Sequence, residues 1–482
     1  MPASATEPLV ATTYRWRWVA LAALLVAEAM NLLDSTIVQV AAPVMHADLG
    51  GSVSDIQWFS TAYSLPFAQL LITGGRLGDI IGRRRAYRVG VTGFMLASLS
   101  CALAPSAGLL IAFRVLQGAA AAVIIPQTIG LIRAMFDGRE ISKAFGSIGP
   151  VMGLAAVCGP VLGGVLTHID LFSSSWRSVF LVNLPLSVVV LALSRLLIED
   201  RAPARPRLDL TGTVLATLGT GLVVYPLTQA TTPLTAGRWA AIGAGLAALA
   251  GFALHQRRSA RLDRRPLVET SLFAGRGFPA ALVTSALYFA VTTGLMLVVV
   301  LHLQLGRGSD VLTAGLTLVP WSGGLAVASW VAGAYLVPRY GHRVMYAGLT
   351  VLLTGLLAAI EVYHSASPTA YPRPLLGALG LAGLGIGLFS PTFFSTALRP
   401  LRPQQIGSAA GLLNAVQQLG ATLGVAGLGS VYLAAAGTGG PGAALAAVQV
   451  AFWVAAGLLL AALASCALMT PPASRTGGHR GS

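Results

Sequence analysis

The sequence predicts an all-helical membrane protein, and three observations lead to that fold class. The chain has 482 residues, of which 55% are hydrophobic and only 10% are charged, whereas roughly a quarter of the residues of an ordinary soluble domain are charged. No Asp, Glu, Lys or Arg lies between Arg402 and Arg475. The apolar runs in that window are about 20 residues long, which is enough for a helix to cross a bilayer.

Runs of this kind recur along the whole chain and predict fourteen membrane-spanning helices. Their frequent Gly, Ala and Pro residues suit close helix packing and local unwinding. The predicted spans fall at 18–42, 57–77, 86–105, 108–130, 143–166, 178–198, 210–229, 237–255, 278–301, 311–336, 344–362, 374–397, 407–433 and 446–469.

The distribution of Lys and Arg predicts the orientation, because cytoplasmic loops retain basic residues and translocated loops do not. With the N-terminus inside, 26 of the 31 Lys and Arg fall in predicted cytoplasmic segments, and four fall in outer loops. The remaining one, Arg114, lies inside the fourth span. Both termini are therefore expected in the cytoplasm, and the net charge of +15 is explained by topology rather than by nucleic-acid binding.

Other classes of site find little support in the sequence. The three cysteines, Cys101, Cys158 and Cys466, all lie in predicted helices, so neither a disulfide framework nor a zinc-ligand set is visible. The seven histidines are scattered without paired spacing, and no GxxxxGK[ST] loop is present. We therefore expect no metal, no cofactor, no ATP-driven step within this chain and no enzymatic activity.

The two longest charged connections, 195–209 and 255–269, divide the chain into three parts. We expect an N-terminal six-helix bundle at 1–205, an inserted two-helix segment at 206–256 and a C-terminal six-helix bundle at 257–482. Transporters are commonly built from such halves, with the site between them near the middle of the membrane.

The loop after the second span, GGRLGDIIGRRR at 74–85, concentrates glycines and charges. Gly75 and Gly82 permit close backbone approach. Asp79 is able to accept hydrogen bonds or to face a helix N-terminus across a cytoplasmic gate. Arg83 and Arg84 are candidate partners for it, although the arginines alone would also serve topology. A degenerate echo, GAYLVPRYGHR at 333–343, follows the tenth span without the acidic residue.

The fifth predicted span contains GPVLGG at 159–164. Pro160 removes a backbone donor, while Gly159, Gly163 and Gly164 leave room for a neighbouring helix. The pattern predicts a bendable and tightly packed helix, and small residues that serve packing alone would give the same pattern.

The first span carries a polar stripe that a lipid-facing helix would not tolerate. At 100° per residue, its polar residues fall within a sector of about 140°, so this face is expected to meet protein or a water-filled cavity. A structural hydrogen-bond seam is the alternative. The stripe consists of Glu28, Asn31, Asp34, Ser35 and Gln39.

Asp34 and Arg114 are predicted to lie at similar depths. Asp34 is about 12 Å from the outer end of the first span, and Arg114 is about 9 Å from the same surface. Burial favours a neutral carboxylate and a nearby arginine favours a charged one, so a motion that separates the two residues would let Asp34 take up and release a proton. Glu28 is a candidate second titrating group or an anchor for a cationic substrate.

A cavity between the halves is expected to hold the substrate. Few acidic groups lie in the membrane, which favours neutral or monocationic amphipathic compounds over polycations. Aromatic residues in membrane helices also serve packing or interface anchoring. The candidate lining residues are Asn31, Gln39, Gln117, Tyr288, Phe289, Trp321, Phe389 and Phe393.

Taken in order, these motifs resemble those of the major facilitator superfamily. GRLGDIIGRRR is similar to the family's loop signature, with Ile80 in place of the usual basic residue; RVLQG at 114–118 resembles the helix 4 signature. GPVLGG is similar to the helix 5 signature of antiporters. LDSTIVQVAAP at 33–43, WRSVFLVNLP at 176–185 and GSAAGLLNAVQQLG at 407–420 resemble the fourteen-span drug:proton antiporter branch.

The resemblance implies a major facilitator fold with fourteen spans and a proton-driven exporter of drugs, antibiotics or related small molecules. It implies a bacterial plasma-membrane protein that acts as a monomer, with a loop that latches the cytoplasmic side. A dedicated exporter of one endogenous metabolite would share these features. A nutrient:proton symporter shares the fold, but GPVLGG argues against it.

Overall fold

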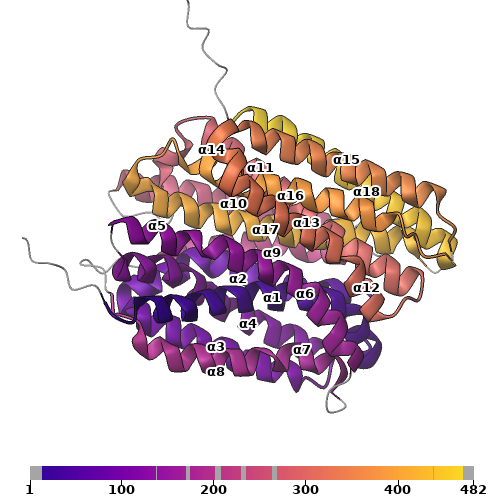
Figure 1. The fold of residues 1–482 in the computed structure, drawn as a ribbon, viewed down its shortest axis with the longest axis horizontal. Coiled ribbons are helices and arrows are strands. Elements are labelled where there is room, and N and C mark those ends of the chain that lie inside the picture. The colour runs from indigo at the N-terminus through magenta and orange to yellow at the C-terminus, as the bar shows by residue number, and fades with distance from the viewer. Residues whose placement is uncertain are drawn as a thin grey trace, which may run out of the picture.

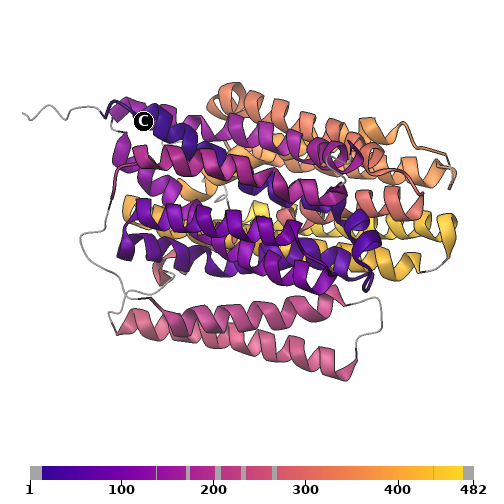
Figure 2. The same ribbon diagram turned by 90° about the horizontal axis from the view of Figure 1, so that it is seen from below.

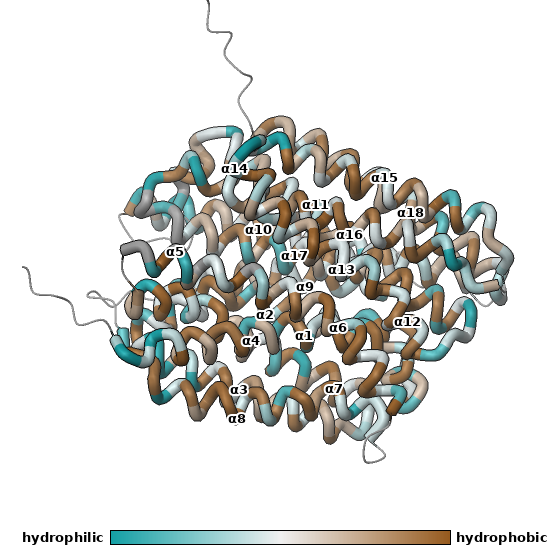
Figure 3. Tube along the Cα trace, viewed as in Figure 1, coloured by the Kyte–Doolittle hydropathy of each residue, from teal (hydrophilic) through white to brown (hydrophobic). Residues whose placement is uncertain are grey.

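The computed structural model describes residues 14–136, 138–169, 174–200, 208–229, 235–262, 269–368, 370–437 and 439–469. Within these residues all regular elements are helical, and most of them run roughly parallel along the long axis of the molecule (Figure 1). Hydrophobic residues dominate the lengths of the helices, and hydrophilic residues gather toward their ends (Figure 3). The arrangement is that of a helical membrane protein.

The helices of residues 14–200, here the N-terminal half, lie together on one side of the molecule (Figure 1). Gly82 separates the second helix from the third with φ 99°, a backbone conformation that glycine adopts without strain. The Ser106 hydroxyl accepts a hydrogen bond from the backbone N–H of Leu109 and so caps the fourth helix. The helices are α1 (Arg17–Leu49), α2 (Asp55–Ile81), α3 (Arg83–Ala102), α4 (Ala107–Met135), α5 (Gly138–Gly146), α6 (Ile148–Ile169), α7 (Ser178–Leu181) and α8 (Asn183–Leu193).

The helices of residues 269–469, here the C-terminal half, lie on the other side (Figure 1). Two short π-helical turns, His302–Gly306 and Ala332–Leu336, continue the helices that precede them. The helices are α11 (Gly277–Leu301), α12 (Val311–Thr317), α13 (Val319–Val331), α14 (Val337–Tyr340), α15 (Arg343–Ser365), α16 (Leu375–Leu398), α17 (Pro403–Ala436) and α18 (Gly440–Ala467).

Two further helices, α9 (Leu210–Thr228) and α10 (Ala236–Arg261), form a separate layer against the rest of the molecule (Figure 2). The Gln69 amide of α2 donates to the Thr220 hydroxyl of α9 at 2.7 Å. The Ser430 hydroxyl of α17 donates to the Leu227 carbonyl of α9 at 2.7 Å. The inserted pair therefore covers the junction of the two halves through α9, while α10 is mostly exposed along its length.

Partial burial acts to raise the pKa of Asp209, the N-cap of α9, but hydrogen bonds outweigh this effect and hold the pKa below its usual 3.8. The donors are the backbone N–H of Gly212 and the side chains of Gln256 and His255. The last two residues lie on α10, so this carboxylate also ties the pair together.

Twelve stretches of the described chain are long and apolar enough to cross a membrane. They coincide with all the predicted spans except those at 57–77 and 86–105. There the chain forms α2 and α3, which are 27 and 20 residues long but less apolar, because uncharged polar residues such as Gln57, Ser60 and Gln69 lie along α2 and arginines open α3. The predicted count of fourteen spans thus stays a prediction.

Several predicted spans differ from the helices observed; the fifth, expected at 143–166, is divided between α5 and α6, and the sixth, expected at 178–198, consists of α7, α8 and a 3-10 turn. The first was expected to end at Ala42, but α1 continues through Pro43 to Leu49, as membrane helices tolerate proline where neighbouring groups satisfy the freed carbonyl. The tenth was expected as one helix at 311–336. It instead consists of α12, α13, a π-helical turn and α14, because Pro320 and Pro338 each lie in the first turn of a new segment, where no backbone donor is needed.

Candidate functional site

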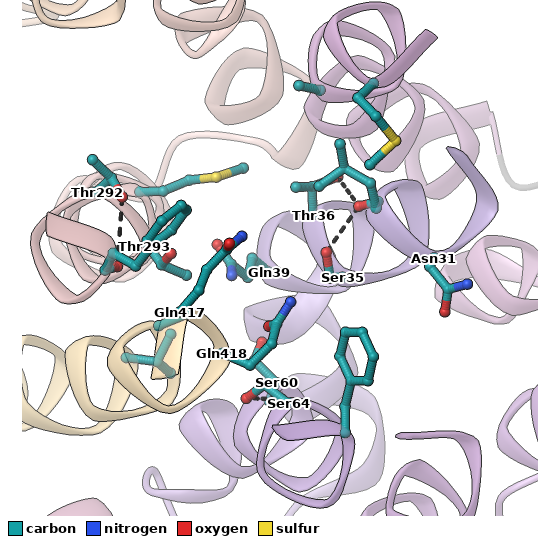
Figure 4. A pocket seen from close by; sticks show the side chains of 18 of the residues that line it. Asn31, Ser35, Thr36, Gln39, Ser60, Ser64, Thr292, Thr293, Gln417 and Gln418 are labelled. Carbon is teal, nitrogen blue, oxygen red and sulfur yellow. Dashed lines mark hydrogen bonds between the residues drawn. The ribbon is translucent and has the colours of Figure 1, made fainter. Parts of the chain in front are cut away.

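A cavity of about 390 Å³ is lined by residues of both halves, a size typical of small-molecule sites. The N-terminal half contributes α1, α2, α4 and α6, and the C-terminal half contributes α11, α13, α16 and α17. Figure 4 shows the polar residues of α1 and α2 on one side of it and those of α11 and α17 on the other.

Eight of the residues named from the sequence line this cavity: Glu28, Asn31, Ser35, Gln39, Arg114, Tyr288, Phe289 and Trp321. Others in the lining were not anticipated, and the largest polar ones are Asn414, Gln417 and Gln418 of α17. A signal for them was present, because three amides within five residues are unusual in an otherwise apolar span.

Three residues predicted to line the cavity are absent from its lining. Phe389 and Phe393 of α16 are fully buried. The Phe389 ring centroid lies 4.1 Å from that of Tyr288, and the Phe393 ring stacks on Phe389 at 5.0 Å. These rings therefore support Tyr288 from behind. The third residue, Gln117, is also buried and lies in the polar network described next.

Asp34 and Arg114 form a fully buried ion pair, with a hydrogen bond from Arg114 Nη1 to Asp34 Oδ2. The other carboxylate oxygen, Oδ1, accepts hydrogen bonds from Gln117 Nε2 at 2.8 Å and Asn183 Nδ2 at 2.7 Å. Ser98 Oγ accepts from the same Gln117 nitrogen at 2.7 Å. The carboxylate of Asp34 is thus enclosed by α3, α4 and α8 and does not line the cavity.

Arg114 separates this network from the cavity. Its guanidinium donates to the Phe59 carbonyl at 2.9 Å and to Gln117 Oε1 at 2.7 Å. Its Cζ atom lies 4.3 Å from the centroid of the Tyr63 ring, a favourable cation–π arrangement. Because Arg114 contacts Asp34 and also contributes to the cavity wall, a single side chain joins the two regions.

The polar stripe of α1 is divided between two environments. Glu28, Asn31, Ser35 and Gln39 line the cavity, whereas Asp34 points into the network. The Asn31 amide is already engaged, since its Oδ1 accepts from the Tyr63 hydroxyl at 2.8 Å and its Nδ2 donates to the Ala27 carbonyl at 2.9 Å. Glu28 is therefore the stripe's carboxylate that faces the cavity.

The prediction of a gating loop at 74–85 is wrong in its secondary structure, because Gly75 and Asp79 lie in the last turns of α2, Arg83 and Arg84 open α3, and Gly82 is the one residue between the two helices. Gly75 packs against Pro126 of α4, where a Cβ atom would lie 3.4 Å from the proline side chain. Asp79 Oδ1 accepts a hydrogen bond from Arg83 Nη2 at 3.1 Å, and Gly82 supplies the positive φ noted above.

Two acidic residues that sequence reasoning did not assign to the loop hold its arginines. Arg83 Nε lies 3.3 Å from Asp200 Oδ2, and the Arg84 backbone N–H donates to Glu199 Oε1 at 3.2 Å. Arg84 Nη1 also donates to the Leu197 carbonyl at 3.1 Å. The loop is thereby fastened to the segment that leads from α8 to the inserted pair.

The GPVLGG segment of α6 packs against α1 on one side and α12 on the other. A Cβ atom at Gly159 would collide with the Thr36 side chain of α1, and one at Gly163 would lie 3.0 Å from the Ile37 carbonyl. At Gly164 it would lie 3.2 Å from the Leu312 Cα atom. The Pro160 carbonyl lies 2.6 Å from a Cβ built at Gly315. These small residues therefore let α6 contact both halves closely.

Comparison with protein families matches residues 24–425 to the Major Facilitator Superfamily. Among curated proteins, the chain is 42% identical over 434 residues to the probable actinorhodin transporter of Streptomyces coelicolor, covering 88% of this chain and 74% of that one. It is 37% identical over 437 residues to the puromycin resistance protein pur8 of Streptomyces alboniger, covering 88% and 84%.

Among solved structures, a bacterial homolog to the human lysosomal transporter Spinster, in an inward-facing and unoccupied conformation, aligns with a TM-score of 0.66 and 18% identity. The alignment covers 94% of this chain and 97% of that one. At this identity the likeness concerns the fold.

Proposed function

The chain belongs to the major facilitator superfamily, and from that premise we propose that it is a proton-coupled antiporter that exports amphipathic drugs, antibiotics or related small molecules from the cytoplasm by alternating access. The names of its relatives refer to transport of, or resistance to, antibiotics, which supports drug efflux. Membership of this family also supports transport rather than catalysis.

The observation that carries the proposal of proton coupling is the position of Arg114. It pairs with the buried carboxylate of Asp34 and at the same time contributes to the wall of the cavity. An unpaired charge within a bilayer costs several kcal/mol, so a motion that draws Arg114 away from Asp34 would favour uptake of a proton by that carboxylate. Return of Arg114 would favour its release.

Substrate arrival at the cavity is the event proposed to move Arg114. Arg114 lines the cavity and also contacts Asp34, so a ligand that displaces the guanidinium from the wall also changes the environment of the carboxylate. In this scheme Asp34 is protonated from the outside and deprotonated toward the inside. Glu28, which faces the cavity, serves as a second titrating group or as the counter-ion of a cationic substrate.

The loop and the glycine-rich segment take mechanical roles in the proposal. Asp79, Arg83 and Arg84, together with Glu199 and Asp200, would fasten the cytoplasmic end of the N-terminal half during the cycle. Close packing at Gly159, Pro160, Gly163 and Gly164 would let α6 bend or rock against α1 and α12 without opening a gap. Alternating access needs such contacts to be discrete rather than fluid.

We further propose that α2 and α3 cross the membrane as well, which would give fourteen spans arranged as six, two and six. Both helices pack among spans that satisfy the length and hydropathy criteria, and each is long enough to cross the hydrocarbon core. An even number of spans agrees with cytoplasmic termini in a bacterial plasma membrane. The transporter is proposed to work as a monomer, since the cavity is lined by one chain.

Everted membrane vesicles test the proposal directly, with ethidium as a monocationic amphipathic probe. Vesicles that contain the protein should accumulate ethidium when their lumen is acidified, and a protonophore should abolish that accumulation. Uptake that persists unchanged with the protonophore would refute proton coupling. A susceptibility panel of antibiotics in whole cells, run in parallel, would measure the breadth of export.

A dedicated exporter of one endogenous metabolite is the second candidate, favoured by the name of the first relative, which refers to a single compound. For such an exporter, the susceptibility of cells to the antibiotic panel should not change when the protein is present. Cells that make the metabolite but lack the protein should retain it. A nutrient symporter, the third, predicts accumulation by right-side-out vesicles on acidification of the outside.

A further inference from the structure

Several hydroxyl groups in the cavity wall are already engaged in hydrogen bonds within their own helices. The hydroxyls of Ser35 and Thr36 both donate to the Leu32 carbonyl at 2.9 Å. The Thr292 hydroxyl donates to the Tyr288 carbonyl at 3.0 Å. Since each of these protons is bound one turn back in its own helix, the hydroxyls offer a ligand only their lone pairs.

Four carboxamides line the cavity in addition to Asn31, whose amide is already engaged. Gln39 comes from α1, and Asn414, Gln417 and Gln418 come from α17. Within the described residues, Gln39 Oε1 is buried and has no hydrogen-bond partner, and no hydrogen bond joins the Gln39 and Gln417 side chains. Figure 4 shows Gln417 projecting from α17 toward α1, where Gln39 lies, while Gln418 lies beside Ser60 and Ser64 of α2.

The chemistry of a carboxamide restricts what it binds best. Its carbonyl and its NH2 group stand side by side, so it pairs bidentately with an edge that has a donor next to an acceptor, as Gln and Asn do with the edge of adenine. A buried carbonyl without a partner, such as Gln39 Oε1, destabilises the empty cavity, and a ligand donor that pairs with it removes that cost. The terminal torsion of Gln is broad, which lets this group turn toward a ligand donor.

Aromatic residues of α11 and α13 also line the cavity. Tyr288 and Phe289 lie edge to face with their centroids 5.0 Å apart, and the Trp321 side chain also lines the cavity. Tyr288 is held in place by the Phe389 ring and by its hydrogen bond to Ser390 Oγ at 3.0 Å. A fixed aromatic surface of this kind suits a flat apolar ligand.

We propose that Gln39 and Gln417 form a carboxamide clamp, which selects planar aromatic substrates that carry a hydrogen-bond donor beside a carbonyl on one edge, such as lactams and cyclic imides. The proposal rests on the proposed function, whose cavity it describes. It gives the segment 407–420 a role in substrate binding through Gln417. It also narrows the proposed substrates from amphipathic compounds in general to planar aromatic compounds with a donor beside a carbonyl.

Naphthalimide, a fluorescent planar imide, tests the clamp by equilibrium binding to the purified full-length protein without a proton gradient. N-methylnaphthalimide lacks the donor, and a ring-methylated naphthalimide adds the same bulk while its imide edge stays intact. We expect the wild-type protein to bind naphthalimide and its ring-methylated form about tenfold more tightly than the N-methyl form. Equal affinity for all three would overturn the clamp, and this comparison depends on no variant.

Variants then locate the preference. Gln39→Leu and Gln417→Leu should each remove most of the tenfold preference, whereas Gln449→Leu, which removes a glutamine of α18 outside the cavity lining, should keep it. A preference that survives both of the first two substitutions would overturn the assignment, as would its loss only in Gln449→Leu. Failure of proton-driven ethidium uptake with an intact naphthalimide preference would refute the proposed coupling and leave the clamp standing.

Discussion

Among the described residues, the N-terminal half lines the cavity with ionic groups as well as with the rings of Tyr63 and Phe67, whereas the C-terminal half lines it with aromatic rings and no ionic group. On the first side, Asp34 and Arg114 are paired and fully buried, with Glu28 in the cavity wall. On the second side, Tyr288 rests on Phe389, which stacks on Phe393. The two halves of the sequence therefore meet one cavity with different chemistry.

The difference bears on energetics. A buried ion pair often stabilises a fold no more than apolar residues of similar volume would, because desolvation offsets the attraction. Packed aromatic rings carry no such penalty and favour flat apolar surfaces. We infer that the buried ion pair of the N-terminal half couples transport to protons. The aromatic rings of the C-terminal half are inferred to bind the substrate. Substitutions on each side should then fail in different ways.

The largest effect is expected from Asp34→Asn. The amide retains hydrogen bonding to Gln117 and Asn183 but cannot exchange a proton, so proton-driven ethidium uptake should fall by about a hundredfold or more while the protein still folds. Asp34→Ala should in addition lower stability by about 3–5 kcal/mol, because Arg114 would remain buried without its partner. Vesicle uptake and thermal unfolding of the purified protein measure the two effects separately.

Proton-driven transport by Asp34→Asn at the wild-type rate would refute the assignment of proton coupling to the N-terminal half, since the buried pair would then have only a structural role. The matched substitution on the other side is Phe393→Leu, which alters an equally buried side chain behind Tyr288. It should leave the dependence of uptake on the proton gradient unchanged.

Helix packing gives the second expected effect. An Ala side chain at Gly159 would collide with Thr36 of α1, so Gly159→Ala should destabilise the protein by about 2 kcal/mol. Gly427 of α17 has open space at its Cβ position, and Gly427→Ala should be neutral or stabilise by up to about 1 kcal/mol. Thermal unfolding of the two variants compares them, and equal melting temperatures would show that α1 and α6 adjust more freely than their contacts indicate.

The sequence predicted most of the helices and about half of the contacts at the candidate site. The reasons for both outcomes are physical. Hydropathy identifies long apolar helices, and rise per residue places Asp34 and Arg114 at similar depth. Neither reports contacts between distant segments. Asn183 lies 149 residues from Asp34. An amide side chain within an apolar run indicates that Asn183 has a buried hydrogen-bond partner, but the sequence does not indicate which residue that partner is. Phe389 and Phe393 share a face of α16, but periodicity alone does not say whether that face meets the cavity or another helix.

The aromatic side supplies the third prediction. Phe289 lines the cavity and is partly exposed within it, so Phe289→Ala should raise the concentration of ethidium for half-maximal uptake about tenfold, through the loss of apolar and cation–π contact. The maximal rate and its dependence on the proton gradient should remain near wild type. A variant that lost the response to the gradient would place coupling in both halves and remove the division of roles.

The smallest effect concerns an ion pair at the end of the N-terminal half. Arg17 donates from Nε and Nη2 to the Glu140 carboxylate at 2.8 and 3.0 Å, and this hydrogen bonding lowers the pKa of Glu140 from its usual 4.5. A carboxylate with a lowered pKa in the folded state contributes stability above its unfolded pKa. It loses that contribution as the pH falls through the folded value.

The melting temperature of the wild-type protein should therefore decline more steeply below about pH 4.5 than that of Glu140→Gln, and the two should differ by a constant amount above about pH 6. Arg17→Gln should flatten the profile to the same extent. The double variant should match either single one, because each substitution removes the same pair. If Glu140→Gln kept the wild-type slope, the Arg17–Glu140 pair would not contribute to the acid sensitivity of the protein.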